Sequence, residues 1–232
     1  MALVSSSPFR RAFVRLLLTG HWPLFSMANI RFLKLLLFTN ALVPLVVLLW
    51  DVTHGRGGSN PTELMTRTTG MLTLLFLLLT LAVTPARKIT GLNSLVRFRR
   101  MLGLFAFFYG SLHLLTYIGF DRFFKLASIP GDVMSRPFIA FGMIAFLLLV
   151  PLAITSTNNM VKRIGGKRWS QLHKIVYGAG VAGALHFWFF VKSDTRLPLT
   201  FGFLLLLLLA HRVFVKVYPP EPERHDVGTT AR

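Results

Sequence analysis

Three histidines lie inside long apolar stretches of the sequence: His113, His173 and His186. An imidazole is costly in hydrocarbon unless its nitrogens are bound, so each of the three needs a partner. The chain contains no Cys, which excludes thiolate ligands and iron–sulfur clusters and leaves histidine as the strong ligand for a soft metal or for haem iron. The first chemistry to consider is therefore a metal or haem centre inside a bundle of apolar helices.

The alternative for each histidine is a hydrogen bond to a Ser, Thr or Tyr on a neighbouring helix. Three histidines on two helices, without an Asp or Glu in mid-span, favour a shared metal cofactor over a proton relay. The other four histidines are expected to be solvated or interfacial: His21, His54, His211 and His225.

The distance of each histidine from the preceding basic cluster indicates which of them pair. At about 1.5 Å per residue, His113 lies about 20 Å beyond Arg100, whereas His186 and His173 lie about 27 Å and about 8 Å beyond Arg168. We therefore expect His113 and His186 to be the axial ligands of one haem. His173 would lie nearer the cytoplasm, at a second haem or another redox group. On an ideal helix, His173 and His186 lie about 140° apart around the helix axis, so the two side chains need not both face the interior of the bundle.

The helices that must position these histidines are long enough to cross a membrane. A spanning helix needs about 20 mostly apolar residues, and 53% of this chain is hydrophobic. Only helices satisfy the backbone within each such segment. We predict an all-α membrane protein, a six-transmembrane-helix bundle, with spans at about residues 32–50, 68–83, 101–120, 137–155, 172–191 and 199–217.

The net charge of +18 indicates a membrane rather than nucleic acid, because the cations lie at the ends of apolar segments. Six spans put both termini on one side, together with most of the 26 Lys and Arg residues, whereas most of the acidic residues fall on the other side. This asymmetry predicts that both termini are cytoplasmic. Around the transmembrane domain at 31–217 we expect an interfacial amphipathic extension at 1–30 and a polar cytoplasmic tail at 218–232.

Several short motifs follow one another along these spans: RRMLGL at 99–104, LHLLTY at 112–117, ITS at 154–156, GKRWSQLH at 166–173 and HFW at 186–188. Through them the chain resembles the ferric-reductase-like transmembrane family, and within it the haem-binding membrane subunits of methionine sulfoxide reductase systems. The resemblance covers residues 30–216, and the motifs are specific as a set.

The resemblance implies b-type haem and FMN as cofactors, and His113, His173 and His186 match the haem-associated histidines of the family. It implies electron transfer through the bacterial inner membrane, from the quinone pool or a cytoplasmic flavin reductase to a periplasmic molybdopterin-dependent methionine sulfoxide reductase that repairs oxidised envelope proteins. The chain would then be the electron-transfer subunit and not the catalytic one. The sequence itself indicates no FMN-binding residues.

Other functions stay open at this point. A ferric or oxygen reductase-type haem protein with a different partner is one alternative. A self-sufficient form of it would need nicotinamide- and flavin-binding parts, and no G-x-G-x-x-G follows a strand in this sequence. A non-redox transporter with structural histidines would explain the hydropathy, but neither mid-span acids nor internal symmetry is evident. A structural membrane anchor would leave the three histidines without a role.

Overall fold

The computed structural model describes residues 27–218, and this part of the chain contains helices and no β-strand. The long helices are α2 (Met27–Thr53), α3 (Pro61–Thr90), α4 (Val96–Thr116), α6 (Pro137–Ile154), α9 (Val176–Phe190) and α10 (Arg196–Val217). Short helical segments connect them: η2 (Asn93–Leu95), η3 (Tyr117–Asp121), η4 (Leu126–Ser128), α5 (Ile129–Ser135), α7 (Asn158–Ile164), α8 (Gly166–Leu172) and η5 (His173–Ile175). The extension and the tail expected at the two termini lie almost entirely outside the described residues.

Within residues 27–218, five helical segments are long and apolar enough to cross a membrane: Asn29–Thr53, Pro61–Thr90, Asn93–Asp121, Pro137–Ile154 and Arg196–Val217. The prediction of an all-helical, multi-pass membrane protein is thereby confirmed. The span expected at 172–191 is not one regular helix, because it divides into the 3₁₀ turn η5 and the 15-residue helix α9.

Helix α3 is longer than the sequence predicted. We expected the second span to end at residue 83, and this is wrong, since the helix continues through Pro85 to Thr90. It begins after Asn60, whose side-chain oxygen accepts a hydrogen bond from the Glu63 amide, and it ends at Gly91, whose φ of 71° is left-handed. A proline is tolerated inside a membrane helix because the surrounding helices satisfy the backbone group that it frees.

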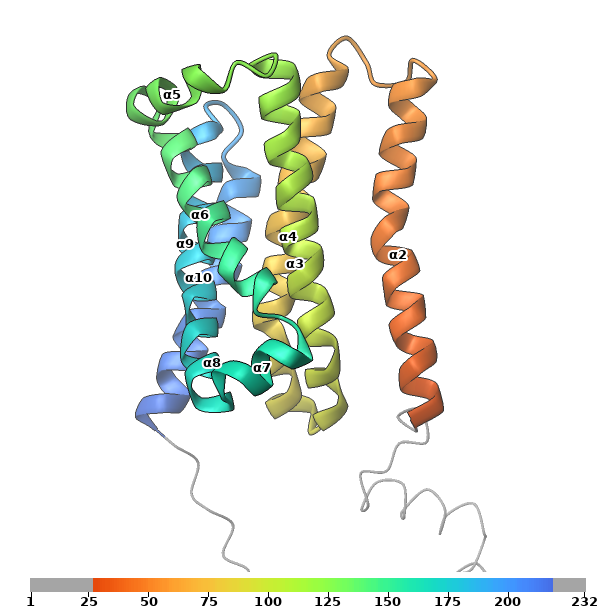
Figure 1. Ribbon diagram of the computed structural model, residues 1–232, viewed down its shortest axis with the longest axis vertical. Helices are drawn as coiled ribbons and strands as arrows, with labels where there is room; N and C mark the ends of the chain where they lie inside the picture. Colours follow the sequence, from red (N-terminus) through yellow and green to blue (C-terminus); the bar gives the residue numbers. More distant parts are fainter. Residues whose placement is uncertain (1–26, 219–232) are drawn as a thin grey trace, which may run out of the picture.

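The helices run alternately up and down, so the first and last described residues lie at the same end of the bundle (Figure 1). We call this end, which also holds α7 and α8, the terminal end, and the opposite one the α5 end. Helix α3 packs along α4, α6 packs along α9, and α10 lies beside α9 and α3. Helix α2 stands to one side (Figure 1), and a hydrogen bond of 2.6 Å from the Tyr109 hydroxyl to the Ala41 carbonyl oxygen links it to the bundle.

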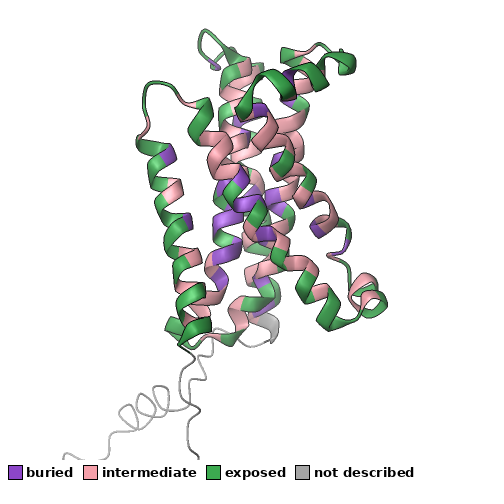
Figure 2. Ribbon diagram, turned by 90° about the vertical axis from the view of Figure 1, so that its left-hand side faces the viewer, coloured by how far each residue is buried: buried purple, intermediate pink, exposed green. Residues whose placement is uncertain are grey.

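The buried residues gather in the middle of the α3–α4–α9 contact, whereas the outward faces of the helices are exposed (Figure 2). Leu77 of α3, Ala106 of α4 and Ala179 of α9 belong to this core. The exposed faces carry large apolar side chains, such as Leu35 of α2 and Leu206 of α10. Apolar side chains on the outside of a helical bundle are what lipid requires.

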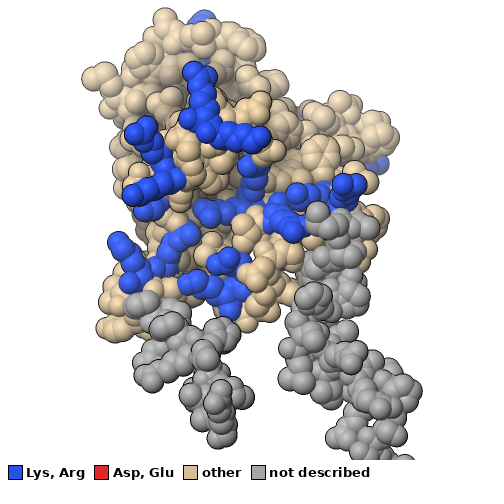
Figure 3. Space-filling view, turned by 60° about the horizontal axis from the view of Figure 1, so that its bottom comes forward, with Lys and Arg blue, Asp and Glu red and all other residues tan. Residues whose placement is uncertain are grey.

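Charge separates along the bundle axis. The face at the terminal end shows many Lys and Arg side chains and no Asp or Glu (Figure 3). The five acidic residues between positions 27 and 218 belong to segments at the α5 end: Asp51, Glu63, Asp121, Asp132 and Asp194. This is the asymmetry that the sequence analysis used to orient the chain.

Candidate functional site

The structure brings two of the three sequence-predicted histidines together. His113 lies in α4 and His186 in α9, and their ring centres are 5.8 Å apart with an angle of 83° between the ring planes. Both rings are partly buried between helices. The depth argument from the sequence paired the same two residues.

Each of these two rings is held by a backbone carbonyl of a neighbouring helix. His113 Nδ1 lies 2.9 Å from the carbonyl oxygen of Thr66 in α3, and His186 Nδ1 lies 2.6 Å from that of Phe138 in α6. A carbonyl oxygen only accepts, so Nδ1 is the protonated nitrogen that donates in both rings. The tautomer is thereby fixed, and Nε2 of each ring is left with its lone pair available for a metal.

The two rings border a cavity enclosed by α3, α4, α6 and α9. Most of its wall is apolar, and four glycines form part of it: Gly70, Gly110, Gly142 and Gly183. Arg67 and Asp121 are the charged residues among those that line it. A largely apolar cavity with a few convergent polar groups is the usual form of a cofactor site.

The donor set fits haem better than a bare metal ion. Within residues 27–218, no group of three or more His, Cys, Asp or Glu side chains is arranged to hold a metal ion. A structural metal ion needs about four protein ligands, whereas a haem iron needs at most two axial ones from the protein. Two imidazoles that meet without a third ligand therefore suit haem.

His173 lies apart from this pair, in η5 at the terminal end. Its Nε2 lies 3.1 Å from the Thr155 hydroxyl, and its ring stacks on Trp169 with 3.8 Å between ring centres. Trp169 Nε1 donates a hydrogen bond of 2.9 Å to the Thr155 carbonyl oxygen. His173 is not among the residues that line the cavity. The structure thus places it in a hydrogen-bonded group of its own.

Two arginines make contacts at the terminal end, where His173 also lies. Arg100 donates a hydrogen bond of 2.5 Å to the Asn158 side-chain oxygen, and the guanidinium of Arg212 lies 4.7 Å from the ring centre of Tyr177. These contacts join α4 to α7 and α10 to α9. The sequence analysis counted these cations but did not predict their partners.

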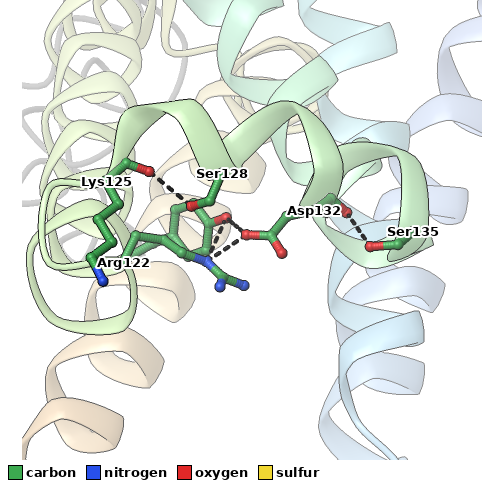
Figure 4. A network of polar contacts seen from close by, with 6 residues as sticks. Arg122, Lys125, Ser128, Asp132 and Ser135 are labelled. Carbon is green, nitrogen blue, oxygen red and sulfur yellow. Dashed lines mark hydrogen bonds and ion pairs between the residues drawn. The ribbon is translucent and has the colours of Figure 1, made fainter.

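A polar network covers the α5 end near the cavity (Figure 4). Asp132 of α5 is only 8% exposed; its carboxylate pairs with Arg122 and accepts a hydrogen bond of 2.6 Å from the Tyr117 hydroxyl. The hydrogen bond to the Tyr117 hydroxyl raises the pKa of Arg122, and the negative charge of the Asp132 carboxylate raises it further. The Arg122 guanidinium therefore stays charged. Tyr117 also lines the cavity. The network therefore connects the outer segment α5 to the wall of the histidine site.

The sequence analysis missed the groups that hold the two histidines. The carbonyls of Thr66 and Phe138 have no side-chain signature, because any residue type supplies a backbone oxygen. Gly70 and Gly142, which lie next to the imidazoles, are ordinary residues of apolar helices when met in the sequence alone. The available signal was a glycine inside a membrane span, at a position where close approach is needed.

Comparison with known proteins gives a consistent result. Residues 68–184 match the family model described as "Ferric reductase like transmembrane component". The chain is 50% identical over 184 residues to the "Protein-methionine-sulfoxide reductase heme-binding subunit MsrQ" of Herminiimonas arsenicoxydans, covering 78% of this chain and 84% of that protein. Proteins of the same description from Rhodospirillum rubrum (51% over 180 residues, 78% and 86% covered) and Ralstonia nicotianae (46% over 188 residues, 80% and 87% covered) are similar. No solved structure gives a significant match.

Proposed function

We propose that this chain, which belongs to the MsrQ haem-binding subunits within the ferric-reductase-like transmembrane family, carries electrons across the membrane through a haem held by His113 and His186. The observation that carries the proposal is the meeting of two imidazoles on different helices, each with Nδ1 bound to a carbonyl and Nε2 available. Haem-ligating histidines are commonly held in this way by a hydrogen bond from the other ring nitrogen.

The separation of the two rings supports this assignment. A metal–imidazole bond of about 2 Å, with the ring centre about 1 Å beyond the nitrogen, puts two rings on opposite faces of one metal about 6 Å apart, centre to centre. The observed ring-centre distance is 5.8 Å. A hydrogen bond to a nearby hydroxyl, which is the alternative for a membrane histidine, would not require the two rings to meet.

The bound haem would supply one-electron redox chemistry, and the residues of this chain would control its setting. His113 and His186 hold the iron, and the apolar walls of α3, α4, α6 and α9 exclude water. Arg67 is the cation of the cavity wall and would meet the carboxylates of the haem. We assign one haem to this pair, because His173 Nε2 already bonds to the Thr155 hydroxyl and would have to exchange that bond to bind iron.

The proposed topology has six passes, with α9 as the fifth, and both termini in the cytoplasm of a bacterial inner membrane. Two observations support it. Helix α9 lies beside α6 and α10 in the bundle and contains no Lys, Arg, Asp or Glu, although it is short. The cations of the terminal end, which has no acidic residue among those described, match the rule that positive loops stay inside.

The relatives are named as subunits of a methionine sulfoxide reductase, so a partner subunit is part of the proposal. We propose that a periplasmic, molybdopterin-dependent reductase receives electrons at the α5 end. Electrons would enter at the terminal end from the quinone pool or from a cytoplasmic flavin reductase. FMN, if bound, would have its phosphate among the cations of the terminal end. The Lys and Arg side chains on that face support this placement.

The experiment is haem quantitation on matched histidine variants. His113→Ala and His186→Ala, purified in detergent, should each lose the haem absorbance, whereas His54→Ala, which alters an exposed histidine, should keep it. Full and unshifted haem spectra in both site variants would refute the assignment. A colourless wild-type protein, produced with ample haem, would favour the transporter with structural histidines. Haem reduction by NADPH without an added reductase would favour a self-sufficient ferric or oxygen reductase.

A further inference from the structure

The two carbonyls that hold the histidines share a local pattern. Thr66 lies four residues before Gly70 in α3, and Phe138 lies four residues before Gly142 in α6. The two histidines come from different helices, α4 and α9, and contact different partner helices. The same arrangement of carbonyl, glycine and imidazole therefore occurs twice, once on each side of the cavity.

A Cβ atom on either glycine would crowd a histidine ring, more closely at Gly142 than at Gly70. A Cβ atom on Gly70 would lie 3.0 Å from Cε1 and 3.1 Å from Nδ1 of His113. On Gly142 it would lie 2.6 Å from Nδ1 and 2.9 Å from Cε1 of His186. In both cases the group that a Cβ would meet is the ring of the histidine itself, at the edge that carries the donated hydrogen.

Helix geometry explains why the glycine must be four residues after the carbonyl. In an α-helix the amide of residue i+4 donates to the carbonyl oxygen of residue i, so the Cα of residue i+4 lies beside that oxygen. The oxygen has a second lone pair, which can accept another donor that approaches from the side. A side chain on residue i+4 would occupy this approach, and glycine leaves it open.

We propose that Gly70 and Gly142 are positioning residues for the haem ligands. Each glycine lets an imidazole reach a helix carbonyl with Nδ1, which fixes the tautomer and turns Nε2 toward the cavity. This inference rests on the proposed function, since it assigns a purpose to the free Nε2 atoms. Gly70 and Gly142 would thus join the haem site although they neither touch the iron nor carry a polar side chain.

An alanine at either position should displace the ring and break its hydrogen bond to the carbonyl. Loss of such a second partner of a metal-bound histidine commonly weakens metal binding by about 10–100-fold. The remaining haem should also change its spin state, because a displaced imidazole leaves one axial position empty or weakly bound. Gly142→Ala should have the larger effect, because its Cβ would come closer to the ring than that of Gly70→Ala.

The test compares four glycine-to-alanine variants of the full chain. Gly70→Ala and Gly142→Ala are the site variants. Gly103→Ala, in the α3–α4 contact, would place its Cβ 3.7 Å from Thr80 Cγ2, an ordinary contact, and Gly202→Ala in α10 would meet nothing within 4 Å. For each purified protein we would measure haem per polypeptide, the haem dissociation constant and the low-spin fraction by electron paramagnetic resonance. Added imidazole then tests whether an axial position has become free.

We expect the order of haem loss to be Gly142→Ala, then Gly70→Ala, with both controls equal to wild type. Excess imidazole should restore the low-spin signal of the haem that the site variants retain, which a general packing defect would not allow. Unchanged haem content and spin state in both site variants would overturn the inference while leaving the histidine assignment intact. Equal losses in Gly103→Ala, or failure of both site variants to accumulate at all, would also overturn it, because the glycines would then serve folding. A wild-type protein without haem would instead refute the proposed function.

Discussion

Replacing Tyr109 with Phe tests how α2 is attached to the rest of the bundle. Tyr109 lies in α4 and is completely buried, and its hydroxyl donates a hydrogen bond of 2.6 Å to the Ala41 carbonyl oxygen of α2. Its ring stacks parallel to that of Phe76, with 5.6 Å between ring centres. Tyr109→Phe removes the hydroxyl and leaves the aromatic packing unchanged, so the variant isolates one interhelical hydrogen bond.

The expected cost follows from the geometry. A hydrogen bond between two groups in a protein contributes about 0.5–1.5 kcal/mol net. The Ala41 oxygen keeps its α-helical donor, the amide four residues on, so the loss leaves no fully unsatisfied carbonyl. We therefore expect a loss of about 1 kcal/mol in the free energy of unfolding. For a chain of this size, that corresponds to a lowering of Tm by roughly 2–4 °C.

The effect should be concentrated in α2, because this helix makes few contacts with α3 and α4. Hydrogen exchange of the purified protein in detergent should show faster exchange in Met27–Thr53 and little change in α6 and α9. Tyr218→Phe, which alters a tyrosine that is 65% exposed, is the matched control and should change neither quantity. An unchanged Tm and exchange rate, or acceleration spread evenly over all helices, would refute this account of α2.

Two further predictions concern the two ends of the bundle. Asp132→Asn should lower Tm, because it weakens a partly buried ion pair and a hydrogen bond. Asp194→Asn, whose ion pair at 4.0 Å is largely exposed, should leave Tm unchanged. Equal shifts in the two melting curves would contradict the first prediction. Thr155→Val should release His173 Nε2 without altering the haem content or the haem spectrum, since His173 is not part of the cavity wall. A rise in haem per polypeptide in this variant would contradict the prediction and show that the released Nε2 binds iron.

The sequence was sufficient for the helices that hydropathy defines. Apolar runs of spanning length predicted α2, α3, α4, α6 and α10, and the predicted start of the fourth span at residue 137 agrees with the start of α6. The second span was predicted to end too early, at residue 83, because Pro85 in the sequence does not say whether neighbouring helices satisfy the carbonyl that it leaves free. The same tertiary information was missing at His173, where hydropathy cannot show that a 3₁₀ turn interrupts the apolar run.

For the candidate site, the sequence could indicate how deep each histidine lies along its helix but not which way its ring points. Counting residues from the basic clusters paired His113 with His186 because helical rise is nearly constant. It could not give the Nδ1 partners, since the hydrogen bonds go to the backbone oxygens of Thr66 and Phe138. Such contacts depend on which helix lies alongside and on how closely it approaches, which only the packed bundle specifies.

The histidine pair lies far from the terminal end of the bundle. His113 lies 17 residues beyond the start of α4, and at about 1.5 Å per residue this is about 25 Å, most of the roughly 30 Å of a bilayer's hydrocarbon core. In the proposed function, an electron that enters at the terminal end would have to cover this distance before it reaches the haem. A redox group near His173 would divide the distance, and the stacked rings of Trp169 and His173 lie at that end, close to Arg99 and Arg100. The proposed haem would then account for the exit of the electron, and a group at the terminal end would have to supply its entry.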